Sequence, residues 1–275
     1  MNIFENENNV VIEDLKNFSL EQTLDCGQAF RWSPEDNGAW SGIANGRFLR
    51  LSMHGDTLTL HDMTLDEFNG FWRRYFDIDR DYAAVIASCK DTELLNHAAD
   101  YGKGIRILSQ EPWEALCSFI ISQNNNIPRI KGIIERLCES FGKKTPDGYA
   151  FPDAAVLAPL TVDDLSPLRS GFRAKYILDA ARKVSSGEID LEALRALDYE
   201  QAREKLMLIK GVGGKVADCT LLFGLGHIEA FPRDVWIKRV MAAHFPEGLP
   251  QSALPHAGII QQYLFDYART GKLDC

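Results

Sequence analysis

The sequence predicts an α+β fold, in which an N-terminal antiparallel β unit with a few helices precedes a mostly α-helical domain. Two observations support this prediction. Residues 47–60 alternate apolar and polar side chains around a Gly-containing turn, which is typical of a β-hairpin. From Glu111 onward, apolar residues recur at helical spacing instead. We therefore expect one domain over residues 1–108 and a second over residues 109–275.

The composition is ordinary for a globular protein. The chain has 275 residues, of which 45% are hydrophobic and 25% charged, and this length allows one large or two modest domains. No apolar run approaches the roughly 18 residues that a membrane span requires, so we expect no membrane association. The acidic N-terminus does not have the pattern of a secretory signal. We expect an intracellular protein, cytoplasmic in a prokaryote and nuclear in a eukaryote.

The cysteines are irregularly spaced and form no Cys-x-x-Cys pair. Neither a zinc site nor an iron–sulfur loop is therefore expected, and the sequence suggests no metal site. Several cysteines lie in apolar runs, and we expect these to be buried free thiols in a reducing compartment. The six are Cys26, Cys89, Cys117, Cys138, Cys219 and Cys275.

The charge distribution is uneven. A formal net charge of −9 argues against nucleic-acid binding by the chain as a whole. Acidic residues are dense at 5–14 and 56–79, whereas basic residues gather between 129 and 183. The sequence thus remains compatible with a small, local phosphate-binding area.

Short elements are expected before residue 108. Asn9–Ile12 is predicted to be a strand, and Arg47–Met53 with Thr57–Leu60 a hairpin that turns at a Gly-Asp pair. Leu24–Trp32 lies between these strands. Leu65–Tyr75 is predicted to be a helix and is rich in aromatic residues.

Helices are expected after residue 111. Pro112 suits a first helical position, and the helix should end at Gln123–Asn126 because asparagine is a poor helix-interior residue. A helix is predicted at Ile127–Phe141, and Gly171 should break the chain before a helix at Ala174–Val184. A last helix is predicted at about Ala257–Arg269, packing back on the N-terminal half.

Residues 199–226 are predicted to form two helices joined by a tight turn at Gly211, Val212 and Gly213. Glycine permits positive φ angles and a close approach of other backbones. The second helix then begins with free N–H groups at its positive end, which suits a phosphate. Lys215 lies in this first turn, where a cation is unfavourable by roughly 0.3–1 kcal/mol. The lysine is therefore either incidental or an amine that must be partly neutral.

Asp234 is placed to cap a helix at Val235–His244, and capping alone would explain it. Alternatively, its carboxylate and the Lys215 amine face one cleft. An aspartate there could hold the amine, carry its proton or stabilise a developing sugar cation. This pair beside a phosphate-binding hairpin is what base excision with a Schiff base at the sugar C1′ would need.

The hairpin, Lys215 and Asp234 together resemble the helix-hairpin-helix Gly/Pro-Asp superfamily of DNA glycosylases. Three further stretches are similar to its 8-oxoguanine DNA glycosylase family, as are two residues near the C-terminus. They are Cys26–Trp32, Pro112–Glu114 leading to Ser122–Ile130, Gly171–Ala174, and the pair Gln261 and Phe265. The resemblance spans about residues 18–266, and the order of the motifs makes it specific.

The resemblance implies a bifunctional DNA glycosylase and AP lyase that excises 8-oxoguanine from double-stranded DNA, with a preference for cytosine opposite the lesion. Lys215 would displace the base and form the Schiff base, while Asp234 would stabilise charge at the sugar. The Gly27 carbonyl would accept the N7 hydrogen that 8-oxoguanine carries and guanine lacks.

The other implied roles concern the flipped base and the duplex it leaves. Gln261 would bond the Watson–Crick edge of the flipped base. Cys219 and Phe265 would stack on its ring, and core packing is the alternative role for these two residues. Asn124 would fill the vacated space, and Phe172 would wedge the stack open.

Arg129 and Arg173 would bind the orphaned cytosine; surface or phosphate-contacting arginines are the alternative. Trp236 departs from the expected pattern, because a histidine with a phosphate role is expected there, and Phe223 is unusual beside the base pocket. The iron–sulfur tail of the endonuclease-type branch is absent from the sequence.

No cofactor is implied, and a monovalent cation at the hairpin carbonyls is left open. A monomer is expected. Two other functions remain open: an alkylated-base glycosylase that uses aspartate and water without needing Lys215, and a non-catalytic DNA-binding module.

Overall fold

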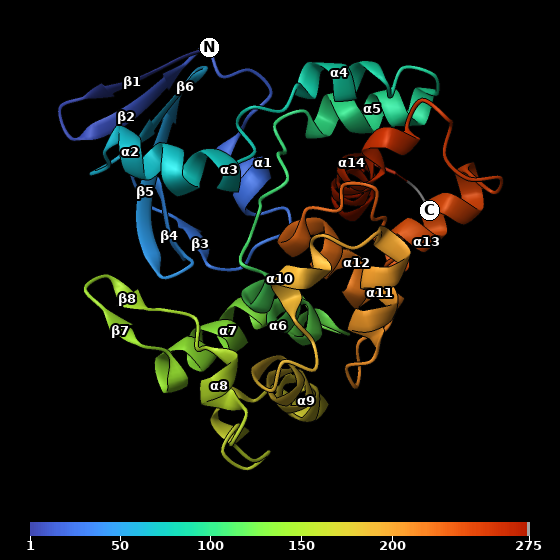
Figure 1. Ribbon diagram of the computed structural model, residues 1–275. Coiled ribbons are helices and arrows are strands. Elements are labelled where there is room, and N and C mark those ends of the chain that lie inside the picture. The colour runs from blue at the N-terminus through green and yellow to red at the C-terminus, as the bar shows by residue number, and fades with distance from the viewer. Residues whose placement is uncertain (274–275) are drawn as a thin grey trace.

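A six-stranded antiparallel sheet is the first element of the computed structural model, which describes residues 1–273 (Figure 1). Its strand order is β1-β2-β6-β5-β4-β3. The strands are β1 (Asn2–Asn6), β2 (Asn9–Glu13), β3 (Trp32–Pro34), β4 (Trp40–Ala44), β5 (Arg47–His54) and β6 (Thr57–Leu60). The expected α+β class is confirmed.

The expected β5–β6 hairpin is present, and its register explains the alternation in the sequence. His54 pairs with Thr57 across the Gly55-Asp56 turn, where Gly55 has a φ of +57°. Leu51 pairs with Leu60, and both side chains are fully buried. Strand β1 was not expected, because its residues are mostly exposed and show no alternation in burial.

A helical segment covers the sheet, as α1 (Leu20–Leu24), α2 (Leu65–Glu67) and α3 (Arg73–Tyr75) show in Figure 1. A π-helical turn, Phe68–Trp72, joins α2 to α3, so the expected Leu65–Tyr75 helix is confirmed with a local irregularity. Trp32 is buried against this segment, and its indole Nε1 donates to the Tyr75 hydroxyl at 2.9 Å.

Helices make up most of the rest of the described chain. They are α4 (Tyr82–Ala87), α5 (Glu93–Gly102), α6 (Pro112–Ser122), α7 (Ile127–Phe141), α8 (Ala154–Leu157), α9 (Ala174–Ser185), α10 (Leu191–Leu194), α11 (Tyr199–Met207), α12 (Gly214–Thr220), α13 (Val235–His244) and α14 (Ala257–Arg269). A small hairpin, β7 (Lys144–Thr145) and β8 (Gly148–Tyr149), follows α7. None of the helices up to residue 273 is long and apolar enough to cross a membrane.

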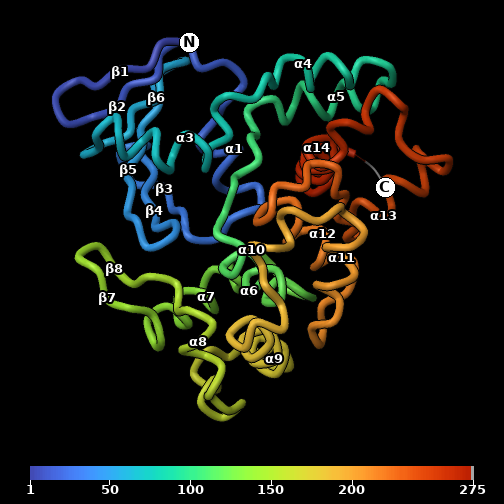
Figure 2. The backbone as a smooth tube through the Cα atoms, in the orientation of Figure 1, coloured from blue at the N-terminus to red at the C-terminus, as the bar shows by residue number. Residues whose placement is uncertain are grey.

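The core is divided between the sheet and the helices. Helices α4 and α5 precede residue 108, yet their buried residues belong to the helical core, and α14 packs against α5. A Cβ at Gly102 of α5 would lie only 2.9 Å from the Tyr263 ring of α14, so the two helices are closely packed. The chain between α5 and α6 then runs between the sheet and the C-terminal helices (Figure 2).

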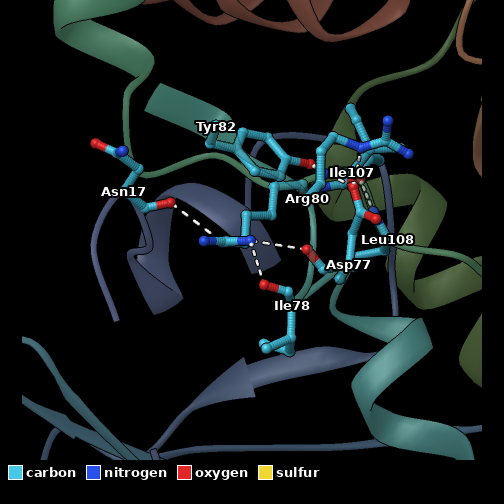
Figure 3. Close-up of polar contacts among 9 residues, drawn as sticks. Asn17, Asp77, Ile78, Arg80, Tyr82, Ile107 and Leu108 are labelled. Atoms are coloured by element: carbon cyan, nitrogen blue, oxygen red, sulfur yellow. Dashed lines mark hydrogen bonds and ion pairs between the residues drawn. The ribbon is translucent and has the colours of Figure 1, made fainter. Parts of the chain in front are cut away.

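Arg106 fixes this connecting segment. Its side chain is buried, and its guanidinium donates to the carbonyl oxygens of Asn17 (3.2 Å) and Asp77 (2.7 Å) (Figure 3). It also lies 4.5 Å from the centre of the Tyr82 ring. Burial lowers the pKa of Arg106. Because a buried guanidinium needs such partners, this network fixes the segment leading into α6.

The cysteines between residues 1 and 273 are free and buried, as expected for several of them. Burial raises the pKa of Cys26 and of Cys138 to about 12, so both are neutral thiols near pH 7. Cys275 lies outside the described residues.

Candidate active site

A cavity of about 740 Å³ brings together residues from both halves of the chain. Six residues predicted for catalysis or base binding line it, namely Gly27, Lys215, Cys219, Asp234, Gln261 and Phe265. Asn124 and Gly213 line it as well. The remaining predicted residues, Arg129, Phe172, Arg173, Gly211 and Val212, do not form its walls.

The hairpin between α11 and α12 has the geometry that the glycines predict. Gly211 has a φ of +82°, and a Cβ there would overlap the ring of Tyr176 from α9. Gly213 is the N-cap of α12 and makes no side-chain capping bond, so the first N–H groups of that helix remain available to a ligand. Val212 is buried, whereas Gly213 is exposed.

Lys215 lies in the first turn of α12 and points into the cavity wall formed by α6. Its Nζ donates to the Ser122 hydroxyl at 3.2 Å and lies 5.1 Å from the centre of the Phe119 ring. Cys219 follows one turn later. Burial raises the pKa of Cys219 to about 11, although the Lys215 charge and hydrogen bond oppose this rise.

Asp234 both caps a helix and faces the cavity. Its Oδ1 accepts from the Ile237 backbone N–H at 2.8 Å, which is the expected cap of α13. Burial raises the pKa of Asp234, opposed by the Ile237 N–H and by the charge of Lys215. Lys215 and Asp234 are thus close enough to interact electrostatically within one cavity.

Gly27 lies in the turn between α1 and β3, with a φ of +86°. A Cβ at this position would make ordinary contacts with Ile127 (3.4 Å) and Phe265 (3.6 Å). The positive φ angle, rather than lack of space, is therefore what favours glycine here.

Gln261 and Phe265 lie one turn apart on α14. Gln261 is only 4% exposed, and its Oε1 has no hydrogen-bond partner among residues 1–273. A buried polar atom usually has a partner, so this one, in a cavity wall, is suited to bind a ligand. Phe265 is half-buried, and Cys219 is buried in the same cavity wall.

The asparagine run ends α6, as predicted. Asn124 is exposed and has a φ of +48°, a left-handed conformation that asparagine tolerates better than most residues. Asn126 caps α7 by accepting from the Arg129 backbone N–H at 3.0 Å. The two asparagines thus have different structural roles.

The two predicted cytosine-binding arginines have different environments. Arg129 is exposed. Arg173 is only 3% exposed, and its guanidinium donates to the carbonyl oxygens of Gln123 (Nε, 2.8 Å), Asn124 (2.9 Å) and Ser170 (3.1 Å). In this structure Arg173 therefore holds the Asn124 turn.

Phe172 is 45% exposed, and the Arg173 guanidinium lies 4.5 Å from the centre of its ring. Trp236 lines the cavity, with the Arg239 guanidinium 5.6 Å from the centre of its ring. Phe223 also lines the cavity and stacks on Phe119, with ring centres 5.3 Å apart.

Sequence reasoning missed Ser122 as a partner of Lys215. Its hydroxyl donates to the Phe119 carbonyl oxygen at 2.8 Å, which leaves oxygen lone pairs to accept from Lys215. A single serine at the end of an apolar helix gives no signal of this contact in the sequence.

Comparison with known proteins supports this arrangement. Residues 10–116 match the N-terminal domain of 8-oxoguanine DNA glycosylase, and residues 117–249 match the HhH-GPD superfamily of base excision DNA repair proteins. A "Probable N-glycosylase/DNA lyase" of Methanothermobacter thermautotrophicus is 33% identical, covering 72% of this chain and 74% of the relative.

Two further comparisons differ in how much of the relative they cover. An "N-glycosylase/DNA lyase" of Saccharomyces cerevisiae is 43% identical over 50% of this chain but only 41% of its own length. The solved structure of Clostridium acetobutylicum 8-oxoguanine glycosylase/lyase, with double-stranded DNA containing cytosine opposite 8-oxoguanine, is 36% identical. It covers 99% of both chains with a TM-score of 0.91. With two family models in sequence and a full-length structural match, this chain belongs to the 8-oxoguanine DNA glycosylase family.

Proposed function

We propose that this protein excises 8-oxoguanine from double-stranded DNA and then cleaves the abasic site, as a bifunctional DNA glycosylase and AP lyase. The observation that carries the proposal is that one cavity is lined by both an amine, that of Lys215, and a carboxylate, that of Asp234. The same cavity holds base-binding groups from Gly27 and from Gln261.

The chemistry follows from these groups. The neutral Lys215 amine attacks C1′, the C1′–N9 bond breaks, and the base leaves with the electron pair and takes up a proton. The Asp234 carboxylate stabilises the positive charge that develops at the sugar. As the sugar ring opens, a proton passes from the attached nitrogen to O4′, which gives a protonated Schiff base between Lys215 and C1′. Loss of a C2′ proton to water then breaks the C3′–O bond and releases the 3′ phosphate. These steps need only Lys215, Asp234 and water, so we propose no cofactor.

Ser122 places an acceptor at the Lys215 amine, and Asp234 lies in the same cavity. Because the Ser122 hydroxyl proton is committed to the Phe119 carbonyl oxygen, Ser122 accepts from Lys215 and does not compete for its lone pair. The lone pair is then free to face a sugar bound in the cavity.

The base is recognised after flipping. The Gly27 carbonyl accepts the N7–H of 8-oxoguanine and repels the N7 lone pair of guanine. Gln261 offers its unpartnered Oε1 to the Watson–Crick edge, and Cys219 and Phe265 stack on the ring. This arrangement would discriminate the lesion by a single hydrogen.

Other groups hold the duplex, and some of them lie outside the cavity walls. The N–H groups after Gly213 bind a backbone phosphate, where the hairpin carbonyls could also take a monovalent cation. Asn124 fills the vacated space, and Phe172 wedges the stack. Arg129 binds the orphaned cytosine, with Arg173 beside it. We place this activity inside the cell, acting as a monomer on duplex DNA.

Borohydride trapping tests the proposal. Wild-type protein with a duplex carrying 8-oxoguanine opposite cytosine should give a covalent complex, because only the amine mechanism forms a reducible imine. Lys215→Gln should bind the same duplex and give no complex. If the wild type excises the base without any trapped complex, the alkylated-base type of mechanism with activated water is favoured. If it binds but never excises, the protein is a non-catalytic DNA-binding module.

A further inference from the structure

The backbone carbonyl oxygens of residues 26, 27 and 28 differ in whether they accept a hydrogen bond. The Cys26 oxygen accepts from Gln262 Nε2 at 3.0 Å, and the Gln28 oxygen accepts from Gln110 Nε2 at 2.7 Å. Within residues 1–273, no donor is hydrogen-bonded to the Gly27 oxygen between them. The two flanking carbonyls are thus occupied, and the central one is left for a ligand in the cavity.

The two amide donors are buried and come from distant segments of the chain. Gln262 is 3% exposed and follows Gln261 on α14. Gln110 is 7% exposed and immediately precedes the N-cap of α6. Its backbone N–H donates to the Phe223 carbonyl oxygen at 2.7 Å, in the π-helical turn that continues α12. Gln110 therefore links the Gly27 turn to the helix that carries Lys215.

The Gln28 side chain also holds the turn in place. Its side chain is fully buried, and its Nε2 donates to the carbonyl oxygens of Thr23 and Arg106, each at 2.8 Å. Its Oε1 accepts from the Leu108 backbone N–H at 2.9 Å. The peptide groups that flank the Gly27–Gln28 peptide are therefore held by buried hydrogen bonds, which are costly to break.

Rigidity of this kind matters for selecting one base over another. Guanine and 8-oxoguanine differ at N7 by one hydrogen, so a carbonyl that could rotate away would lose its repulsion of guanine. A glycine in the left-handed region is flexible by itself. Fixing the peptide groups before and after the Gly27–Gln28 peptide keeps the Gly27 carbonyl pointing in one direction.

We propose that Gln110 and Gln262 are specificity-determining positioning residues, whose side-chain amides occupy the flanking carbonyls and orient the Gly27 carbonyl for 8-oxoguanine. This glutamine bracket, Gln110 and Gln262, holds the carbonyls on either side of the Gly27 carbonyl, and Gln262 also lines the cavity. It acts through Gly27, and the inference rests on the proposed function of that carbonyl.

The test measures binding discrimination without chemistry. Gln110→Met and Gln262→Met are each combined with Lys215→Gln, and dissociation constants are measured for duplexes with 8-oxoguanine or guanine opposite cytosine. Methionine keeps the length of the side chain but removes the donor. Each change should reduce the 8-oxoguanine-to-guanine affinity ratio about tenfold, chiefly by weakening lesion binding.

Gln22→Met is the matched control. Gln22 Nε2 also donates to a backbone carbonyl, that of Tyr101 at 2.6 Å, but Gln22 makes no hydrogen bond to residues 26–28. This variant should keep the wild-type affinity ratio. If a methionine variant fails to fold, the corresponding asparagine variant is used, because it stays polar while its shorter side chain withdraws the donor.

Cleavage of a pre-formed abasic site provides the second measurement. It needs Lys215 but no base recognition, so bracket variants with Lys215 intact should retain it within about threefold while excision of 8-oxoguanine falls about tenfold or more. An unchanged affinity ratio, or equal losses on both duplexes, would overturn the inference. If Lys215→Gln alone shows no preference for the lesion, the proposed function of Gly27 is wrong, and the inference is wrong with it. If Lys215→Gln prefers the lesion and the wild type is trapped, but the bracket variants keep the same affinity ratio, only the inference about Gln110 and Gln262 is wrong.

Discussion

At the scale of single residues, Asp234 caps α13 and also faces Lys215, and the two roles predict a pH dependence. Burial raises the pKa of this carboxyl above its ordinary 3.8. The ionised form is the one that stabilises positive charge at the sugar, so excision should fall as the pH drops through the raised pKa, at a higher pH than an exposed aspartate would give.

Single-turnover excision measured from about pH 4 to about pH 8 checks this prediction. Asp234→Asn keeps a good N-cap and should fold, but it should be slow at every pH and lack this acid limb. An unchanged acid limb in the asparagine variant would assign the titration to another group.

Substitution of Arg129 and substitution of Arg173 should have different effects on the preference for the base opposite the lesion. A good base contact contributes about 1–3 kcal/mol of discrimination, so Arg129→Ala should relax a cytosine preference by about tenfold or more. The same change should slow excision opposite cytosine by a smaller factor than the one by which it relaxes the preference. Arg173→Ala should also slow excision opposite cytosine, because it removes the bonds that hold the Asn124 turn.

Excision rates on four duplexes that differ only in the opposite base provide the measurement. Equal removal of the lesion from all four by the wild type would contradict the role given to both arginines. Identical profiles for the two alanine variants would contradict the division between them.

At the scale of elements, the hairpin offers a matched pair of glycines. Gly211→Ala should destabilise the fold by roughly 2–4 kcal/mol, because the residue has a positive φ and its methyl would overlap Tyr176. Gly213 has a φ of −100° and open space around a Cβ. Gly213→Ala should therefore lower stability by only about 1 kcal/mol or less while weakening DNA binding.

Thermal unfolding and DNA affinity, measured side by side, separate the two effects. A melting temperature for Gly213→Ala as low as that of Gly211→Ala would show that Gly213 has a structural role that the open space around it does not suggest.

Some helices and strands could be predicted from local sequence patterns, and others could not. The β5–β6 hairpin and helices α6, α7 and α12 were predictable because alternation, capping residues and glycines act within a few residues. Strand β1 was not, because it is an edge strand whose apolar residues, Ile3 and Phe4, are adjacent and do not alternate with polar ones. Its assignment depends on pairing with β2, which the burial pattern of its own residues does not reveal.

At the scale of the whole molecule, the net charge of −9 predicts a weak dependence of DNA affinity on salt. Phosphate contacts should be few and made partly by backbone N–H groups of the hairpin. The slope of log K against log salt should then reflect only a few phosphates, at about 0.9 for each.

Dissociation constants over a range of salt concentrations test this. A slope near −10, as for a large basic repressor, would mean that the basic residues between 129 and 183 form a far more extensive contact with DNA than proposed here.

The sequence by itself determined the fold class and the hairpin, and it singled out eight of the residues that line the cavity. Those features depend on local chemistry: glycines that permit a turn, an aspartate that caps a helix, and motifs close together in the chain. The chemical roles assigned to Lys215 and Asp234 remain predictions until trapping is measured, but the structure places both in one cavity.

Only the tertiary structure decided how neighbouring, similar residues differ. Gln261 and Gln262 are adjacent and both buried, yet the Gln261 Oε1 has no partner among residues 1–273, whereas Gln262 holds the Cys26 carbonyl. Arg173 is engaged with three carbonyls, whereas Arg129 is exposed. The physical reason is that a buried polar side chain takes its role from partners far away in sequence, and no local pattern encodes those partners.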